Sequence, residues 1–420
     1  MKSRLNRTIL TIAAAISPLA AHAAEAKPPV AQYWMSVATT NSGFPSMGAT
    51  VDSGGGLMGG LIGGLMGNSA GSGSGSGAQK TLLLQLNSPR ALPSDPQTVH
   101  DIPRGMAMCD NLPLLPEKEE RTRPATNEKF TPHEHESGEK PKGRMLIYWG
   151  CGDKVRSGQP SILDFARMSP VEFGRAMGGR HGSAQNPPAP RRAASYADWP
   201  NRENSKNIPS EGSLLGEHLV HGNFTPDIRF SIGRQQDFMA PVELSNAGGN
   251  LSGSVLLRWK DIPTAIGYFT MATGSTGKGD TIIWSSSSQS ETGWGLMDYL
   301  PTPDVRRFVK EKVLMAADTT ECAVPQGIFS EAQGAMVQMI AYGEDFYTTW
   351  PPKPKNPEGA VKVRLKSTGS LMLADREERA GGRSYTSQNR GRAYTAQPRE
   401  KSDTEKSLDT VNKIRGMFHF

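Results

Sequence analysis

The chain has 420 residues, of which 36% are hydrophobic and 21% are charged, and its formal net charge is +6. Abundant glycine (46) and proline (31), with a mean hydropathy of -0.48, predict that part of the chain is loop or disordered. The basic residues are scattered and form no nucleic-acid-binding motif, so we expect no nucleic-acid partner and only weak attraction to an anionic envelope surface.

Residues 1–23 have the pattern of a cleavable signal peptide. A basic start is followed by an apolar stretch, 9–20, and by the small-x-small sequence Ala21-His22-Ala23. The apolar stretch is shorter than the roughly 20 residues that a spanning helix needs. We therefore expect export to the periplasm or the extracellular space, and no transmembrane helix after signal removal. The alternative is a buried N-terminal helix.

An internal repeat organises the rest of the chain, because four weakly similar segments recur in the same order. The pairs are 33–39 with 268–273, 81–88 with 281–286, 102–106 with 324–328, and 144–150 with 335–343. A fifth pair, 161–165 with 361–365, fits the same series. The alternative explanation is that these segments are unrelated strands, which look alike because strands in general share a similar residue pattern.

These segments are short, rich in β-branched and aromatic residues, and bounded by turn-forming residues, as strands are. We therefore predict a mainly β protein of two antiparallel β-sandwich-like units, with a short helix in the second and long disordered segments. The predicted parts are the signal peptide (1–23), a first β unit (24–179) with a glycine-rich loop insertion (45–79), an irregular connector (180–212), a second β unit (213–374), and a disordered basic tail with a short amphipathic end (375–420).

The glycine-rich run, 54–67, admits two interpretations. The first is a flexible loop carrying Leu and Met side chains. The second is a device for self-association or membrane contact, since small residues let helices approach closely in a membrane. Each glycine inside a helix costs about 1 kcal/mol relative to alanine, which favours the loop.

In the second unit the pattern predicts further strands and one helix. The expected strands are 214–221, 227–232, 240–244 and 254–259, and the expected helix is 303–313. The segment 361–365 alternates apolar and cationic residues. One face of this strand can therefore pack inward while the other meets water or an anionic partner.

One stretch of the second unit resembles a known family. The residues are Leu256-Leu257-Arg258-Trp259, Ile262-Pro263, Ala265 and Gly267-Tyr268. They resemble the first core hairpin of fibronectin type III and other immunoglobulin-like sandwiches, which implies that Trp259 packs near Tyr268. The sequence departs from that family at the predicted helix, where further strands would be expected. The whole chain is also similar to exported proteins of Gram-negative bacteria, a likeness that implies no activity.

Three sequence patterns contain residues that could bind phosphate or metal, but each is better explained by a structural role than by a binding site. The run 274–279 lacks the glycine and the hydroxyl residue that a phosphate loop requires, and is predicted to be a hairpin turn. His133-Glu134-His135-Glu136 could bind a metal weakly but lies in a polar stretch without support. His218 and His221 fall on opposite faces of a strand, so at most one could serve a shared site.

Cys109, Cys151 and Cys322 are the only cysteines, so at most one disulfide forms and one thiol is left over. Cys109 and Cys151 both lie in the first unit and are a candidate pair, which spacing alone cannot decide. There is no zinc-type spacing and no cysteine or serine nucleophile motif.

The second unit also contains acidic residues that could act as acids or bases and tryptophans that could contact a ligand. The carboxylates near turns or helix starts are Asp298, Asp304, Glu344 and Asp345, and the tryptophans are Trp259, Trp284, Trp294 and Trp350. Asp304 favours the positive end of a helix. The tryptophans are expected in the core, although an exposed aromatic on a sheet face could stack against a sugar. No catalytic, cofactor-binding or metal-binding residue is assigned.

The sequence therefore favours an exported, non-catalytic binding protein of the bacterial cell envelope, whose partner is an envelope protein or a polysaccharide. One alternative is an envelope hydrolase whose site leaves no motif. Another is a membrane-associated assembly protein that uses the glycine-rich run.

Overall fold

The computed structural model describes residues 31–42, 77–116, 143–164, 167–169, 179–352 and 357–374. Within these residues the protein is mainly β, as predicted, with one short α-helix, α3 (Thr302–Lys310). Signal peptide 1–23, the glycine-rich run 54–67, the sequence 133–136 and the tail 375–420 lie outside the described residues.

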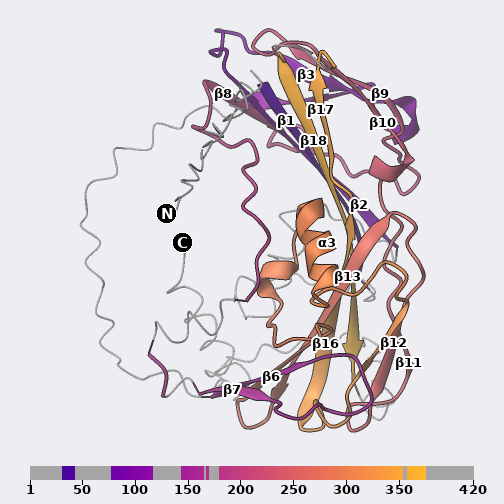
Figure 1. Cartoon of the computed structure of the whole chain (residues 1–420). Coiled ribbons are helices and arrows are strands. Elements are labelled where there is room, and N and C mark those ends of the chain that lie inside the picture. The colour runs from indigo at the N-terminus through magenta and orange to yellow at the C-terminus, as the bar shows by residue number, and fades with distance from the viewer. Residues whose placement is uncertain are drawn as a thin grey trace, which may run out of the picture.

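One long sheet, here called the main sheet, runs through the described molecule (Figure 1). Its strand order is β5-β8-β2-β1-β18-β16-β13-β14-β6-β7, and β17 pairs with β18. The strands are β1 (Ala31–Ser42), β2 (Gln79–Ser88), β5 (Leu115–Pro116), β6 (Arg144–Trp149), β7 (Ser161–Asp164), β8 (Ser195–Trp199), β13 (Ala265–Thr276), β14 (Thr281–Ser285), β16 (Ala332–Gly343), β17 (Phe346–Trp350) and β18 (Gly359–Leu373).

Two smaller sheets lie against the main sheet. The four-stranded sheet has the order β10-β9-β3-β4 and the three-stranded sheet the order β11-β12-β15. Their strands are β3 (Thr98–Asp101), β4 (Asn111–Pro113), β9 (Gly216–Gly222), β10 (Ile228–Ile232), β11 (Ser245–Gly248), β12 (Val255–Arg258) and β15 (Glu321–Val324). Short 3-10 turns are η1 (Arg104–Met106), η2 (Arg234–Gln236) and η3 (Trp294–Leu296).

The main sheet buries its two faces differently. One face packs against both small sheets in a single core that includes Tyr33, Phe230, Val363 and Leu257. On the other face, α3 and the chain around η3 cover β6, β13, β14 and β16. The part of this second face formed by β1, β2 and β18 carries polar and cationic side chains instead, and it is here that the candidate site lies.

The internal repeat is not confirmed. The first two predicted pairs do form comparable antiparallel hairpins, β1 with β2 and β13 with β14. The fourth pair differs, because β16 is central in the main sheet whereas β6 lies next to the edge strand β7. Strands of both predicted units are also hydrogen-bonded in one sheet, through the parallel pairs β1 with β18 and β14 with β6.

The predicted helix and most predicted strands are present, with three corrections. Segments 102–106 and 324–328 are not strands, because each has a proline at its second residue: the first contains the turn η1, and only Val324 of the second lies in β15. Segment 240–244 is not a strand, because Pro241 offers no N–H, and the Val242 carbonyl accepts a hydrogen bond from a β1 side chain, Asn41 Nδ2, at 3.0 Å. The connector 180–212 is not wholly irregular, because it contributes β8, which pairs with β2 in the main sheet.

The disulfide joins Cys151 to Cys322, so the candidate pair of Cys109 with Cys151 is wrong and Cys109 is the free thiol. The reason is the parallel pairing of β6 with β14, which carries the turn after β6 to the three-stranded sheet. There the Gly152 N–H donates to the Ala323 carbonyl at 2.9 Å, beside Cys322.

The stretch that resembles an immunoglobulin-like hairpin brings its two aromatic rings together. The Trp259 and Tyr268 centroids are 5.8 Å apart in an edge arrangement, and the Tyr268 hydroxyl accepts a hydrogen bond from the Ile262 N–H. Trp259 follows β12 of the three-stranded sheet, and Tyr268 lies on β13 of the main sheet, so this contact joins two layers.

In the part of the chain that the structure describes, no helix has both the length and the apolar character needed to cross a bilayer.

Candidate functional site

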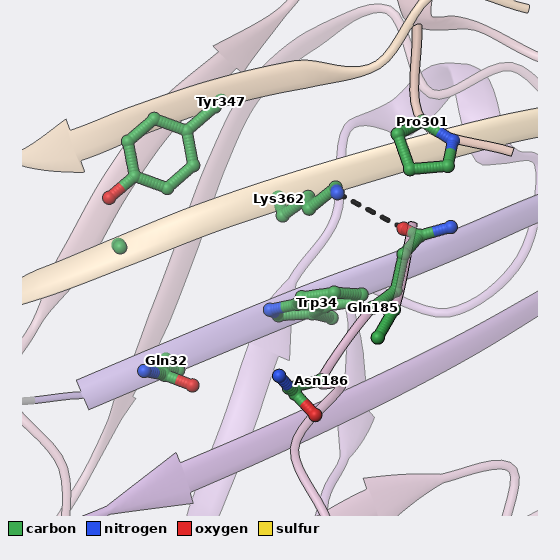
Figure 2. A pocket seen from close by; sticks show the side chains of 9 residues that line it. Gln32, Trp34, Gln185, Asn186, Pro301, Tyr347 and Lys362 are labelled. Atoms are coloured by element: carbon green, nitrogen blue, oxygen red, sulfur yellow. Dashed lines mark hydrogen bonds between the residues drawn. The ribbon is translucent and has the colours of Figure 1, made fainter. Parts of the chain in front are cut away.

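A groove of about 350 Å³ lies on the polar part of the main sheet's second face (Figure 2). This volume is at the lower end of the range for small-ligand sites, about 300–1,000 Å³. Its lining residues come from β1, β17, β18, the segment after residue 183 and the start of α3: Gln32, Trp34, Ala184, Gln185, Asn186, Pro301, Tyr347, Ala360 and Lys362.

Strand register explains the floor of the groove. One row across β2, β1, β18 and β17 consists of Asn87, Gln32, Ala360 and Thr349. The next row on the same face consists of Gln85, Trp34, Lys362 and Tyr347. Because Ala360 has the smallest side chain of either row, the floor is lowest between Gln32 and the β17 side.

Lys362 is held in place at this floor. Its ammonium donates to Gln185 Oε1 at 3.0 Å, pairs with an Asp345 carboxylate oxygen at 3.2 Å, and lies 4.8 Å from the centroid of the Trp34 ring. Burial raises the pKa of Asp345, and the attraction of Lys362 only partly offsets this effect. Gln185 and Asp345 together hold the Lys362 ammonium in place, and the Asp345 carboxylate offsets much of its charge.

A row of cations on β18 continues from Lys362 along the same face. Arg364 stacks between Trp34 and Tyr299, with its guanidinium carbon 5.5 Å and 4.4 Å from their ring centroids, and its Nε donates to Ser36 Oγ. Lys366 lies over Tyr299 and donates to Asp298 Oδ1 at 2.7 Å. Burial opposes ionisation of Asp298, but Lys366 lowers the pKa of this carboxyl overall. The alternation predicted for 361–365 is confirmed, because Val361, Val363 and Leu365 are buried on the opposite face.

Other polar groups of the groove have no partner. Among the residues that the structure describes, neither the Gln32 nor the Asn186 side-chain amide of the lining forms a hydrogen bond. Asn87 Oδ1, opposite Gln32 on β2, also has no partner, but Asn87 is buried and is not part of the lining. Tyr347 is 62% exposed and stands on the β17 side (Figure 2). The groove therefore presents amides and a phenol that are free to bind a ligand.

A second group of titratable side chains is sealed in the core between the main and four-stranded sheets. The Tyr33 hydroxyl lies 2.8 Å from His100 Nδ1, His100 Nε2 lies 2.9 Å from His218 Nδ1, and His218 Nε2 lies 2.7 Å from the Leu214 carbonyl oxygen. A carbonyl can only accept, so His218 donates through Nε2, His100 donates to His218, and Tyr33 donates to His100. All three side chains are buried, so the chain of bonds has a structural role.

The remaining predicted candidates have structural surroundings. His218 is buried while His221, on the other face of β9, is partly exposed beside Asp101, as the strand period predicts. Of segment 274–279, residues 274–276 end strand β13 and only 277–279 lie in the turn before β14, so the predicted hairpin turn is confirmed for the second half of the segment. Trp259 and Trp284 are buried in the core, as expected.

The four carboxylates considered as acid–base candidates are each engaged with a nearby cation, which the sequence does not reveal. Asp298 and Asp345 bind lysines of β18, Asp304 binds Arg307 and the Ser183 N–H, and Glu344 binds Arg306. Within the described residues no three His, Cys, Asp or Glu side chains gather as a metal site.

Sequence reasoning missed Trp34, Tyr347 and the amides of the groove. The signal for Trp34 is present in β1, where Tyr33, Met35 and Val37 are buried and the intervening residues face the other way. No local signal places Asn186 there, because its segment reaches the sheet only through tertiary packing. Comparisons with family models, curated proteins and solved structures found no match.

Proposed function

We propose that the protein is an exported, non-catalytic binding protein of the bacterial cell envelope, and that it takes its ligand in the groove. The observation that carries this proposal is the lining itself. It combines an exposed aromatic ring, unpaired amides and a fixed cation, which are groups that position a ligand by stacking and hydrogen bonding.

The chemistry of the lining favours binding over hydrolysis. None of the described lining residues is a carboxylate, histidine, serine, threonine or cysteine. Lysine and tyrosine can also act as acids, bases or nucleophiles when a neighbouring group activates them. The Lys362 ammonium is instead paired with Asp345 and bonded to Gln185, and no described side chain is hydrogen-bonded to the Tyr347 hydroxyl.

Two observations support the exported location. The N-terminal sequence has the basic, apolar and small-x-small parts of a secretion signal. The Cys151–Cys322 disulfide is stable in an oxidising compartment and uncommon in a reducing one. Fractionation of the producing cells, with mass determination of the N-terminus, tests this part: processing after Ala23 is expected, and an unprocessed cytoplasmic chain would contradict it.

Retention of the purified protein on immobilised bacterial envelope tests the binding part. The wild type should be retained, and Tyr347→Ala should lose most retention because the exposed ring is a contact group rather than a core residue. Ile162→Ala is the control, since Ile162 is 53% exposed on the edge strand β7, away from the groove. Equal retention of the wild type and both variants would remove the groove from the proposal.

A further inference from the structure

We infer that the groove binds an uncharged sugar unit of an envelope glycan, with one face of the sugar ring stacked on Tyr347 and its hydroxyls hydrogen-bonded to Gln32 and Asn186. This inference rests on the proposed function and specifies its ligand.

The polar groups left free in the groove are side-chain amides. An amide offers one acceptor and two donors, so it can pair with neighbouring hydroxyls that each donate and accept. Gln32 and Asn186 supply two such amides around the small residue Ala360, and both lack partners among the described residues. Leaving them unpaired against an apolar ligand would be unfavourable, so the ligand must carry several hydroxyl or amide groups.

Tyr347 gives the groove an exposed aromatic surface. Tyr347 and Lys362 are directly opposite in register, and Tyr347 stands beside the low part of the floor on the β17 side (Figure 2). Its ring is exposed, whereas the Trp34 ring is covered by Lys362 and Arg364. Tyr347 is therefore the available platform for the C–H face of a sugar ring, and Trp34 supports the floor.

The charge of the groove also bears on its ligand. Lys362 is the one cation among the described lining residues, and it is paired with Asp345 at 3.2 Å, whereas Arg364 and Lys366 lie beyond the lining. An anionic ligand in the groove would have to displace Asp345 from Lys362. The compensated charge favours an uncharged ligand, whose binding depends little on ionic strength.

The strand pairing at the floor favours a glycan over a peptide. Peptides commonly bind by adding a strand to an open sheet edge, where main-chain groups are free. The groove floor is formed by β1 and β18, and each of these strands is paired on both sides, whereas β17, which carries Tyr347 at the rim, is paired with β18 alone in the described residues. The floor therefore offers side chains only, which suits a sugar better than an extended peptide.

The experiment uses immobilised envelope in three forms: untreated, oxidised with periodate to cleave sugar diols, and digested with a protease. Wild-type retention should be lost after periodate and preserved after protease treatment. Retention that is lost after protease, preserved after periodate and still dependent on Tyr347 would overturn the glycan inference while leaving the proposed function standing. Retention that does not depend on Tyr347 would remove the groove from the proposed function, and the glycan inference would fall with it.

Titration of the purified protein with neutral oligosaccharides from the same envelope, followed by calorimetry, tests the roles of single residues. We expect Tyr347→Ala to weaken binding about tenfold, Tyr347→Phe to keep most of the affinity, and Gln32→Ala or Asn186→Ala to weaken it roughly fivefold. Ile162→Ala should match the wild type. Affinity that falls steeply with added salt, or that is stronger for acidic oligosaccharides, would contradict the uncharged ligand.

Discussion

Two buried histidines make the stability of the core sensitive to acid. Burial lowers the pKa of His100 well below its ordinary value, and repulsion from His218 acts in the same direction. Burial likewise lowers the pKa of His218. In the hydrogen-bond chain from Tyr33 to the Leu214 carbonyl both imidazoles are neutral, so a second proton would break a bond and place a charge in the core.

The free energy of unfolding should therefore be steady above about pH 6.5. It should fall as the pH drops below that value, because the histidines of the unfolded chain then take up protons while the folded histidines stay neutral. The slope is at most about 1.4 kcal/mol per pH unit for each proton taken up only by the unfolded chain. Urea unfolding at a series of pH values measures it.

His100→Gln should reduce this slope, since glutamine can accept and donate along the same chain but does not ionise in this range. His221→Gln is the control, because the His221 side chain is 39% exposed. A wild-type slope equal to that of His100→Gln would show that His100 does not contribute.

Among the elements, the disulfide fixes the turn after β6 to β15. Its cysteines are 171 residues apart in the sequence, so it closes a long loop. Cross-links of this kind stabilise folded domains by about 2–5 kcal/mol. The pair of changes Cys151→Ser and Cys322→Ser should lower the free energy of unfolding by this amount in guanidinium titrations.

Cys109→Ser provides the matched control, because Cys109 is the free thiol and should tolerate the change within about 0.5 kcal/mol. Destabilisation by Cys109→Ser as large as that of the double change, or none from the double change, would contradict the assigned pairing.

Across the whole molecule, the main sheet makes the two predicted units depend on one another. β1 of the first unit pairs with β18 of the second over its full length, and β6 pairs with β14. A fragment containing only 24–179 or only 213–374 would expose these strand edges and half of the shared core.

We therefore expect neither fragment to unfold cooperatively when it is expressed alone, whereas the whole protein should show coincident far-UV and near-UV circular dichroism transitions. A fragment with its own sharp thermal transition and a well-dispersed NMR spectrum would show that the units are independent.

The sequence by itself determined the strand-rich character, the helix at α3 and the two-faced pattern of 361–365, because these depend on side chains a few positions apart along one element. Only the tertiary structure decided the parallel pairs, the partner of Cys151 and the groove. β1 and β18 lie at opposite ends of the described chain, and their pairing depends on which surfaces bury each other rather than on any local pattern. For the same reason the sequence alone does not predict that Asn186 and Tyr347 line the same groove as Gln32, because that depends on the register of the paired strands.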